Sequence, residues 1–142
     1  MKINIKKLHE DAIVPTYAKA WDAGADLYAD KDYTIYYNDR EVVGTGIAIE
    51  IPSGYVGLIH PRSGMASKYG ITVLNSPGTI DAGYRGELKV ILVNHTGSNY
   101  DVKKGDKIAQ LVIQKVEEAE FTVVDELNDS SRGDGGFGST GV

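Results

Sequence analysis

Alternating apolar positions predict β-strands along much of this chain. In EVVGTGIAIEI, residues 41–51, the side chains at every second position are β-branched, and those between them are mostly small. A period of two places the first set on one face of a strand. The small residues opposite indicate that another segment approaches that second face closely. The expected buried face consists of Val43, Thr45, Ile47, Ile49 and Ile51.

Shorter apolar runs predict further strands. PSGYVGLIH, residues 52–60, is typical of a turn and a strand, and we expect it to form a hairpin with residues 41–51. GELKVILVNH, residues 86–95, is apolar on both faces and should be buried on both. NYDVKKGDKIAQLVIQ, residues 99–114, predicts two strands around a Lys-Lys-Gly-Asp turn. VEEAEFTVVDEL, residues 116–127, is ambiguous between helix and strand, and we favour strand.

Helical periodicity is weak, and the one short helix predicted is SGMASKYG, residues 63–70, ended by Gly70. Many short strands with 17 glycines predict an all-β protein: a sandwich, a jelly roll or a small barrel. At 142 residues the chain should form one domain. We expect residues 1–127 to fold and residues 128–142, rich in glycine and serine, to form a flexible tail.

Composition narrows the function classes. The net charge of −5 argues against a nucleic-acid binder. No stretch approaches the roughly 20 apolar residues of a membrane span, and MKINIKKLHE lacks a signal-peptide run. The absence of cysteine excludes disulfides and thiol chemistry. These features predict no membrane partner and an intracellular protein, cytoplasmic or inside the host cell if the source is viral.

Familiar catalytic motifs are missing. The chain has neither a Walker phosphate loop nor a dinucleotide fingerprint. His9, His60 and His95 lie too far apart in sequence for metal-ligand spacing, so a histidine-centred triad is poorly supported. PRSGMASKYG instead places Arg62 and Ser63 at the start of the predicted helix, an arrangement that suits a phosphate. A capped turn with a surface arginine explains the same spacing about equally well.

A second polar cluster lies in VLNSPGTIDAGYRGEL, residues 73–88. Backbone groups of such a bend can read the edge of a flat base, and Tyr84 can stack on a ring or a sugar. Asp81 can accept a proton from water. The alternative is a long turn with a solvated aspartate, which is commoner.

The tail SSRGDGGFGSTGV, residues 130–142, has two interpretations. It is either a frayed terminus or a flap that orders over a ligand. In the second case Arg132 would meet an anion, Phe137 a flat ring, and Ser139 and Thr140 would supply hydroxyl groups.

Taken in order, five segments resemble the trimeric dUTP pyrophosphatase (dUTPase) family over essentially the whole chain. They are AGADLYA, PRSGMASKYG, NSPGTIDAGYRGE, GDKIAQLV and RGDGGFGSTG. Two departures are small: Lys107 stands where arginine is frequent, which keeps the charge but loses a bidentate contact, and Ala82-Gly83 stands where Ser-Asp is common.

The resemblance implies a distorted β-barrel or jelly roll that forms a homotrimer, with each active site shared among subunits. It implies hydrolysis of dUTP to dUMP and pyrophosphate with Mg²⁺ across the phosphates, which limits uracil incorporation into DNA and supplies dUMP for dTMP synthesis. By the same resemblance, Asp81 activates the attacking water and Tyr84 stacks beneath the deoxyribose. Asp26 contacts Mg²⁺ through water.

The remaining roles are also implied by the resemblance. The base is read by Asn75 and the backbone around Thr79, Ile80 and Lys89. The phosphates are held by Arg62, Ser63, Gly64 and Gln110. In the tail, Arg132 reaches the γ-phosphate, Phe137 covers the uracil, and Ser139 and Thr140 add hydroxyl contacts.

Two rivals remain at this stage. A deoxycytidine-triphosphate deaminase would need an acid/base glutamate at the hairpin, whereas Asp81 is there and Glu87 comes only after the motif. A binding or regulatory protein is the rival from another class. Five intact motifs make a purely non-catalytic role improbable, but a regulatory protein partner stays open.

Overall fold

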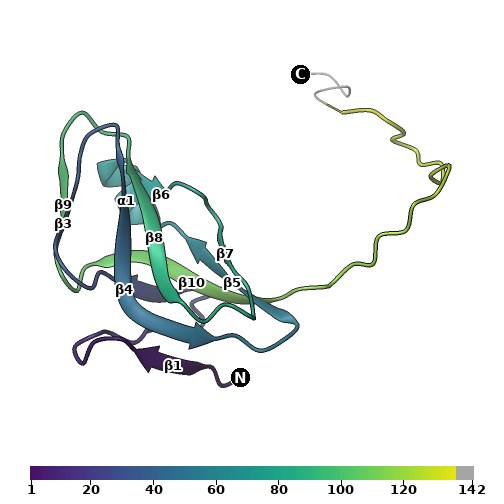
Figure 1. The fold of residues 1–142 in the computed structure, drawn as a ribbon. Helices are drawn as coiled ribbons and strands as arrows, with labels where there is room; N and C mark the ends of the chain where they lie inside the picture. The colour runs from purple at the N-terminus through teal and green to yellow at the C-terminus, as the bar shows by residue number, and fades with distance from the viewer. Residues whose placement is uncertain (137–142) are drawn as a thin grey trace.

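The computed structural model describes residues 1–136, which form antiparallel strands and one short helix (Figure 1). The first sheet has the strand order β1 (Asn4–Lys7), β4 (Arg40–Glu50), β8 (Glu87–Asn94), β6 (Ile71–Val73). The second has the order β2 (Ala25–Tyr28), β10 (Lys107–Lys115), β5 (Tyr55–His60), β7 (Gly78–Ile80). A third sheet pairs β3 (Tyr33–Ile35) with β9 (Tyr100–Val102), and helix α1 (Ser63–Tyr69) follows β5 in sequence.

One apolar core joins the two larger sheets. The side chains that fill it are fully buried and come from both sheets and their connections, for example Leu27, Ile35, Ile47, Ile51, Leu88, Val90 and Ile108. The predicted all-β class is therefore confirmed. Within residues 1–136 the sheets do not close into a barrel, so the jelly-roll form of that prediction is the one that holds.

Strand β4 has the predicted two-faced pattern. All five residues of the expected inner face are buried. On the other face, a β-carbon at Gly44 would lie 2.8 Å from the carboxylate oxygens of both Asp30 and Glu87. Gly46 has a φ of 68°, in the left-handed region, and lies against Ala12 and His9. The close approach predicted from the small residues is confirmed.

The predicted hairpin between residues 41–51 and 52–60 is wrong. Strand β4 pairs with β1 and β8, whereas β5 pairs with β10 and β7. The turn around Gly54 therefore carries the chain from one sheet to the other. A turn signal shows where the chain changes direction, but pairing with strands far away in sequence decides which sheet each strand joins.

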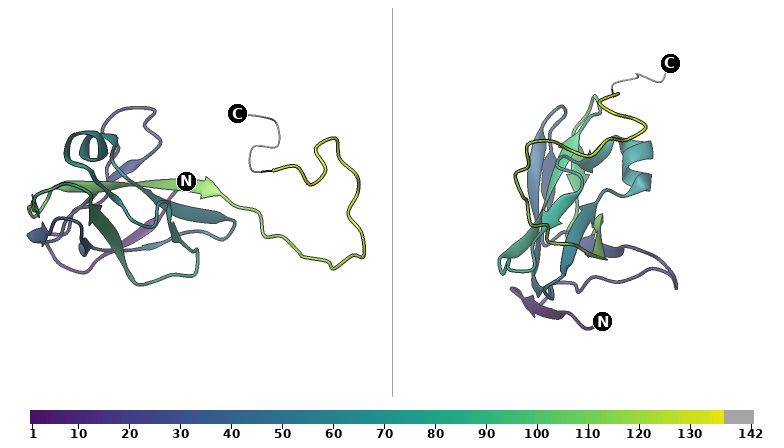
Figure 2. Two further views of the ribbon diagram at one scale, coloured as in Figure 1. Left: turned by 90° about the horizontal axis from the view of Figure 1, so that it is seen from above. Right: turned by 90° about the vertical axis from the view of Figure 1, so that its right-hand side faces the viewer.

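The predicted strand at residues 116–127 is also wrong, since strand β10 ends at Lys115 and this stretch has no regular structure. Phe121 and Val123 are 94% and 99% exposed. A strand needs a partner for its backbone groups, and Figures 1 and 2 show residues 116–136 running away from the sheets.

Two further local predictions hold, and a third holds only in part. Helix α1 ends at Gly70, whose φ of 57° allows its N–H to bond the carbonyl of Ala66. The Lys-Lys-Gly-Asp turn joins β9 and β10, with Gly105 at a φ of 82°. Strand β8 is buried on both faces only in its second half, because Lys89 is exposed. No helix among residues 1–136 is long and apolar enough to cross a membrane.

Candidate active site

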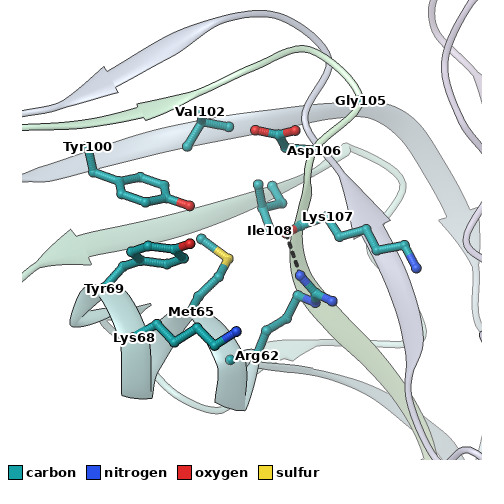
Figure 3. A pocket seen from close by; sticks show the side chains of 11 residues that line it. Arg62, Met65, Lys68, Tyr69, Tyr100, Val102, Gly105, Asp106, Lys107 and Ile108 are labelled. Atoms are coloured by element: carbon teal, nitrogen blue, oxygen red, sulfur yellow. Dashed lines mark hydrogen bonds between the residues drawn. The ribbon is translucent and has the colours of Figure 1, made fainter.

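A buried carboxylate organises the first polar cluster. Asp26, on β2, is only 3% exposed. The Nζ atom of Lys107 lies 2.8 Å from its Oδ2, and the Nε atom of Arg62 lies 3.6 Å from its Oδ1. Arg62 also donates from Nη1 to the carbonyl oxygen of Lys107 at 3.2 Å, the dashed line in Figure 3. The three residues form one network across strands β2 and β10.

Strand pairing explains why these residues meet. Gln110 on β10 lies opposite Asp26 on one side and His60 on the other, so β10 is the central strand between them. A β-carbon at Gly24 would lie 2.9 Å from the Cβ atom of Gln110, so the loop before β2 packs directly on that glutamine. Segments far apart in sequence are thereby held together.

The network has an electrostatic consequence. The hydrogen bond to Asp26 and its negative charge raise the pKa of Lys107. Lys107 therefore stays charged, and Asp26 has a cation near each carboxylate oxygen. A buried carboxylate without such partners would be strongly unfavourable.

Ser63 and Gly64 open helix α1 beside this network. Both are exposed, and no atom lies within 4 Å of a β-carbon placed at Gly64. Met65 is buried and anchors the helix. A cavity of about 520 Å³ lies between the helix and strands β9 and β10. Figure 3 shows Arg62, Lys68 and the hydroxyl groups of Tyr69 and Tyr100 around it.

The predicted base-reading residues also lie together, but elsewhere. A small cavity of about 60 Å³ on strands β7 and β8 is lined by Asn75, Thr79, Ile80 and Lys89, with apolar residues beneath. Asp81 follows β7 directly and is exposed. Its carbonyl oxygen accepts a hydrogen bond from the N–H of Tyr84 at 3.0 Å, which closes the turn.

The structure does not bring these groups into one pocket. Of the cavities found among residues 1–136, the one lined by Arg62 contains no residue of the hairpin, and the one lined by Asn75 contains none of α1. Arg132 lies in the tail, where its Nε donates to the carbonyl oxygen of Gly135 at 2.9 Å. The predicted contacts Phe137, Ser139 and Thr140 lie outside the described residues.

Comparison with known proteins decides the family. A model described as dUTPase matches residues 10–141. The chain belongs to the dUTPase family.

Curated dUTPase relatives match nearly the whole chain. The deoxyuridine 5′-triphosphate nucleotidohydrolases of Nautilia profundicola and Thermobifida fusca are 52% and 54% identical to it. Each alignment covers 99% of this chain, and 99% and 79% of the respective relatives.

Solved dUTPase structures show the same fold. A mutant dUTPase of Staphylococcus bacteriophage 80alpha, solved with dUpNHpp, has a TM-score of 0.93 at 31% identity, with 99% of both chains covered. A mutant dUTPase from phage phi11 of S. aureus has a TM-score of 0.85 at 28% identity, covering 91% of this chain and 100% of that one. That phage structure is described as revealing the coordination of a structural Mg(II) ion. The two packed sheets therefore form the dUTPase jelly roll.

Sequence reasoning missed Lys107 as a site residue. It was noted only as a replacement for a frequent arginine, although the structure places it directly on Asp26. The register between β2 and β10 shifts between Lys107 and Ala109. Such a bulge turns a side chain toward a different neighbour, and alternation along the sequence does not reveal it.

The donor set of this dUTPase fits a metal that arrives with its nucleotide. Among residues 1–136 no three His, Asp or Glu side chains converge on one point. Mg²⁺ is commonly bound through one or two carboxylates together with substrate phosphates. Asp26 is the carboxylate of the first motif, and Arg62 and Lys107 already contact it. Both carboxylate oxygens of Asp26 therefore already have a cationic partner.

Proposed function

We propose that this chain hydrolyses dUTP to dUMP and pyrophosphate at sites completed by neighbouring copies of itself. The dUTPase activity follows from the family to which the chain belongs. The observation that carries the proposal for the site is the separation of two groups: a small cleft on the hairpin that holds Asn75, Thr79 and Lys89, and a cationic cluster beside α1.

The hairpin supplies base and sugar recognition. Asn75 and the backbone around Thr79, Ile80 and Lys89 read the uracil edge. The narrow cleft disfavours the methyl group of thymine, and the exocyclic amine of cytosine would leave buried polar groups unpaired. Tyr84 stacks beneath the deoxyribose and leaves no room for a 2′-hydroxyl group.

The cationic cluster holds the phosphates. Arg62 binds a phosphate, and Ser63, Gly64 and Gln110 supply further donors. Asp26 supports this role because it fixes the guanidinium of Arg62 from the side of Nε, while Nη2 stays available. Positioning of this kind supplies much of the rate in phosphoryl transfer.

Asp81 acts as the general base. Its carboxylate is exposed at the end of β7, where a water and a nucleotide phosphate have access. It accepts a proton from the water that attacks the α-phosphate, and it holds the 3′-hydroxyl group. Because a carboxylate is a weak base, orientation of that water contributes more than its deprotonation.

Mg²⁺, when bound with the nucleotide, neutralises charge on the phosphates, and Asp26 would hold it through water. Glu87 does not fit the deaminase alternative. Its Oε1 accepts the N–H of Gly46 at 3.0 Å, and its Oε2 lies 3.6 Å from Lys89 Nζ. That carboxylate is therefore occupied within the sheet.

Assembly as a homotrimer would complete each site, with the hairpin from one subunit, the phosphate turn from a second and the tail from a third. The exposed Phe121, Val123 and Leu127 support association, because apolar surface in an extended segment is costly unless another surface covers it. Residues 128–142 act as a lid: Arg132 reaches the γ-phosphate, Phe137 covers the uracil, and Ser139 and Thr140 add hydroxyl contacts.

In the cell, this reaction would limit uracil incorporation into DNA and supply dUMP for dTMP synthesis. Both roles require access to the nucleotide pool, so we place the protein in the cytoplasm. No partner other than dUTP and copies of the chain is needed for the reaction.

Pyrophosphate release from dUTP, dTTP, dCTP and UTP with Mg²⁺ tests the proposal. We expect rapid release from dUTP alone, and loss of about 10²-fold or more in kcat for Asp81→Asn. Ammonia release from dCTP would instead support a deaminase. Equal turnover of dUTP and dTTP would contradict base reading by the hairpin, and full activity of Asp81→Asn would remove its role as base.

A further inference from the structure

The ring of Tyr84 lies against the backbone of Gly86. A β-carbon at Gly86 would lie 2.6 Å from Cζ and 3.0 Å from Cε2 of that ring, and would also meet its hydroxyl oxygen. Ordinary carbon contacts begin near 3.5 Å. No side chain larger than a hydrogen atom therefore fits beneath Tyr84 in this position.

A hydrogen bond from its hydroxyl group fixes the position of the Tyr84 ring. The Tyr84 hydroxyl donates to the carbonyl oxygen of Glu87 at 3.0 Å. Glu87 begins β8, lies opposite Ala48 in β4, and its side chain accepts the N–H of Gly46. The acceptor of the Tyr84 hydrogen bond therefore belongs to the sheet and not to a loose loop.

Much of the ring stays accessible. Tyr84 remains 44% exposed although the hydroxyl end of its ring rests on Gly86. Its N–H is also fixed by the turn to Asp81. The hydroxyl end of the ring is thus held at a fixed height above the hairpin, while the ring keeps accessible surface.

We propose that Gly86 is a specificity-determining positioning residue that sets the height of the Tyr84 ring. The inference rests on the proposed function, in which the sugar of the nucleotide lies on Tyr84. Because residue 86 carries only a hydrogen atom, the Tyr84 ring can lie close to the hairpin backbone. At this height the space above the ring accepts a deoxyribose but has no room for a 2′-hydroxyl group.

A methyl group at position 86 must displace the ring. If the ring rises toward the sugar, dUTP binds less well while UTP stays a poor substrate. If the ring swings aside, space opens for the 2′-hydroxyl group and UTP improves. Either movement lowers the ratio of kcat/KM for dUTP to that for UTP.

The test compares Gly86→Ala with Gly83→Ala in the full chain. Gly83 lies in the same hairpin, no atom lies within 4 Å of a β-carbon placed there, and neither glycine has a left-handed φ. We expect the dUTP-to-UTP ratio to fall about tenfold or more in Gly86→Ala and to stay unchanged in Gly83→Ala. A merely structural defect would lower activity on both substrates equally and leave the ratio unchanged, which would overturn the inference.

A double-variant cycle separates the inference from the proposed function. In the Tyr84→Ala background, Gly86→Ala should have no further effect on the ratio, because the ring that it displaces is gone. If Gly86→Ala lowers the dUTP-to-UTP ratio equally in both backgrounds, the role of Gly86 is overturned while the proposed function stands. If Tyr84→Ala by itself leaves the ratio unchanged, the sugar platform of the proposed function fails, and the role of Gly86 fails with it.

Discussion

At the residue scale, Asp26 holds Arg62 in place through an ion pair. A buried carboxylate attracts whichever cations are near, and here it has two. Because Lys107 contacts one oxygen at 2.8 Å, Arg62 needs only a looser contact with the other. In the proposed site, Lys107 would therefore keep Arg62 from pairing more tightly with Asp26, so that its Nη2 can meet a phosphate.

Removing the charge of Lys107 should weaken substrate binding. In Lys107→Met we expect Asp26 to draw Arg62 inward, and kcat/KM for dUTP to fall about tenfold. Lys107→Arg should restore it, since arginine keeps the charge. Lys103→Met is the matched control, because Lys103 pairs with Asp32 at the surface. Unchanged kcat/KM in Lys107→Met would contradict this role.

The hydrogen-bonded hydroxyl group of Tyr33 makes the stability of the fold depend on pH in the alkaline range. Its hydroxyl donates to Asp30 Oδ1 at 2.6 Å and accepts the N–H of Gly44 at 2.9 Å. Burial and the Asp30 hydrogen bond raise the pKa of Tyr33 to about 12. An unfolded tyrosine ionises near a pH of about 10. Between these values the folded state keeps a proton that the unfolded state loses, so the free energy of unfolding falls as pH rises.

Urea unfolding at pH values from about 9 to about 12 tests this expectation. The stability that Tyr33 contributes should be fully present below a pH of about 10 and lost toward a pH of about 12. Tyr33→Phe should show a shallower alkaline decline, while Tyr36→Phe, which changes a ring that is 60% exposed, should decline like the unaltered chain. Equal slopes in the Tyr33→Phe variant and the unaltered chain would show that another group sets the limit.

At the element scale, the predictions that held depend on local chemistry. The buried face of β4 follows from alternation, and the end of α1 follows from the left-handed φ of Gly70. The predictions that failed depend on long-range pairing. Strands β4 and β5 are adjacent in sequence but belong to different sheets, and residues 116–127 have strand-like composition without a strand to pair with.

The same distinction explains the site. Motif residues could be listed from the sequence because each motif is continuous. The contact between Lys107 and Asp26 depends on a register shift in β10, and the contact between Tyr84 and Gly86 depends on a turn geometry. Neither contact can be recognised from the order of residue types in the sequence.

Deletion of the tail should lower catalytic activity without lowering the stability of the fold. The side chains of residues 128–136 are exposed or only partly covered, so deletion of residues 128–142 removes no core contact from the described part. We expect an unfolding curve like that of the full chain and a fall of about 10²-fold in kcat/KM for dUTP, since a donor to the phosphates is lost. Undiminished activity in the deleted chain would leave the tail a simple terminus.

At the scale of the whole molecule, the two groups of predicted site residues lie apart within one chain. The hairpin carries Asp81 and lines one cavity, whereas Arg62, directly before α1, lines another, and neither of these two cavities among residues 1–136 is lined by both segments. If each site combines the hairpin of one copy with the phosphate turn of the next, two variants that are inactive for different reasons should restore activity when they assemble together.

Mixed assemblies test that arrangement directly. Asp81→Asn and Arg62→Ala should each be nearly inactive alone. Refolded together in equal amounts, they should recover about one quarter of the full activity, because about one site in four would combine the intact hairpin of one variant with the intact turn of the other. Mixing two preparations of the same variant is the control. If the mixture stays as inactive as its parts while native mass spectrometry shows mixed oligomers, each chain must carry its own complete site. The separation seen between the hairpin and Arg62 would then have to close within one subunit.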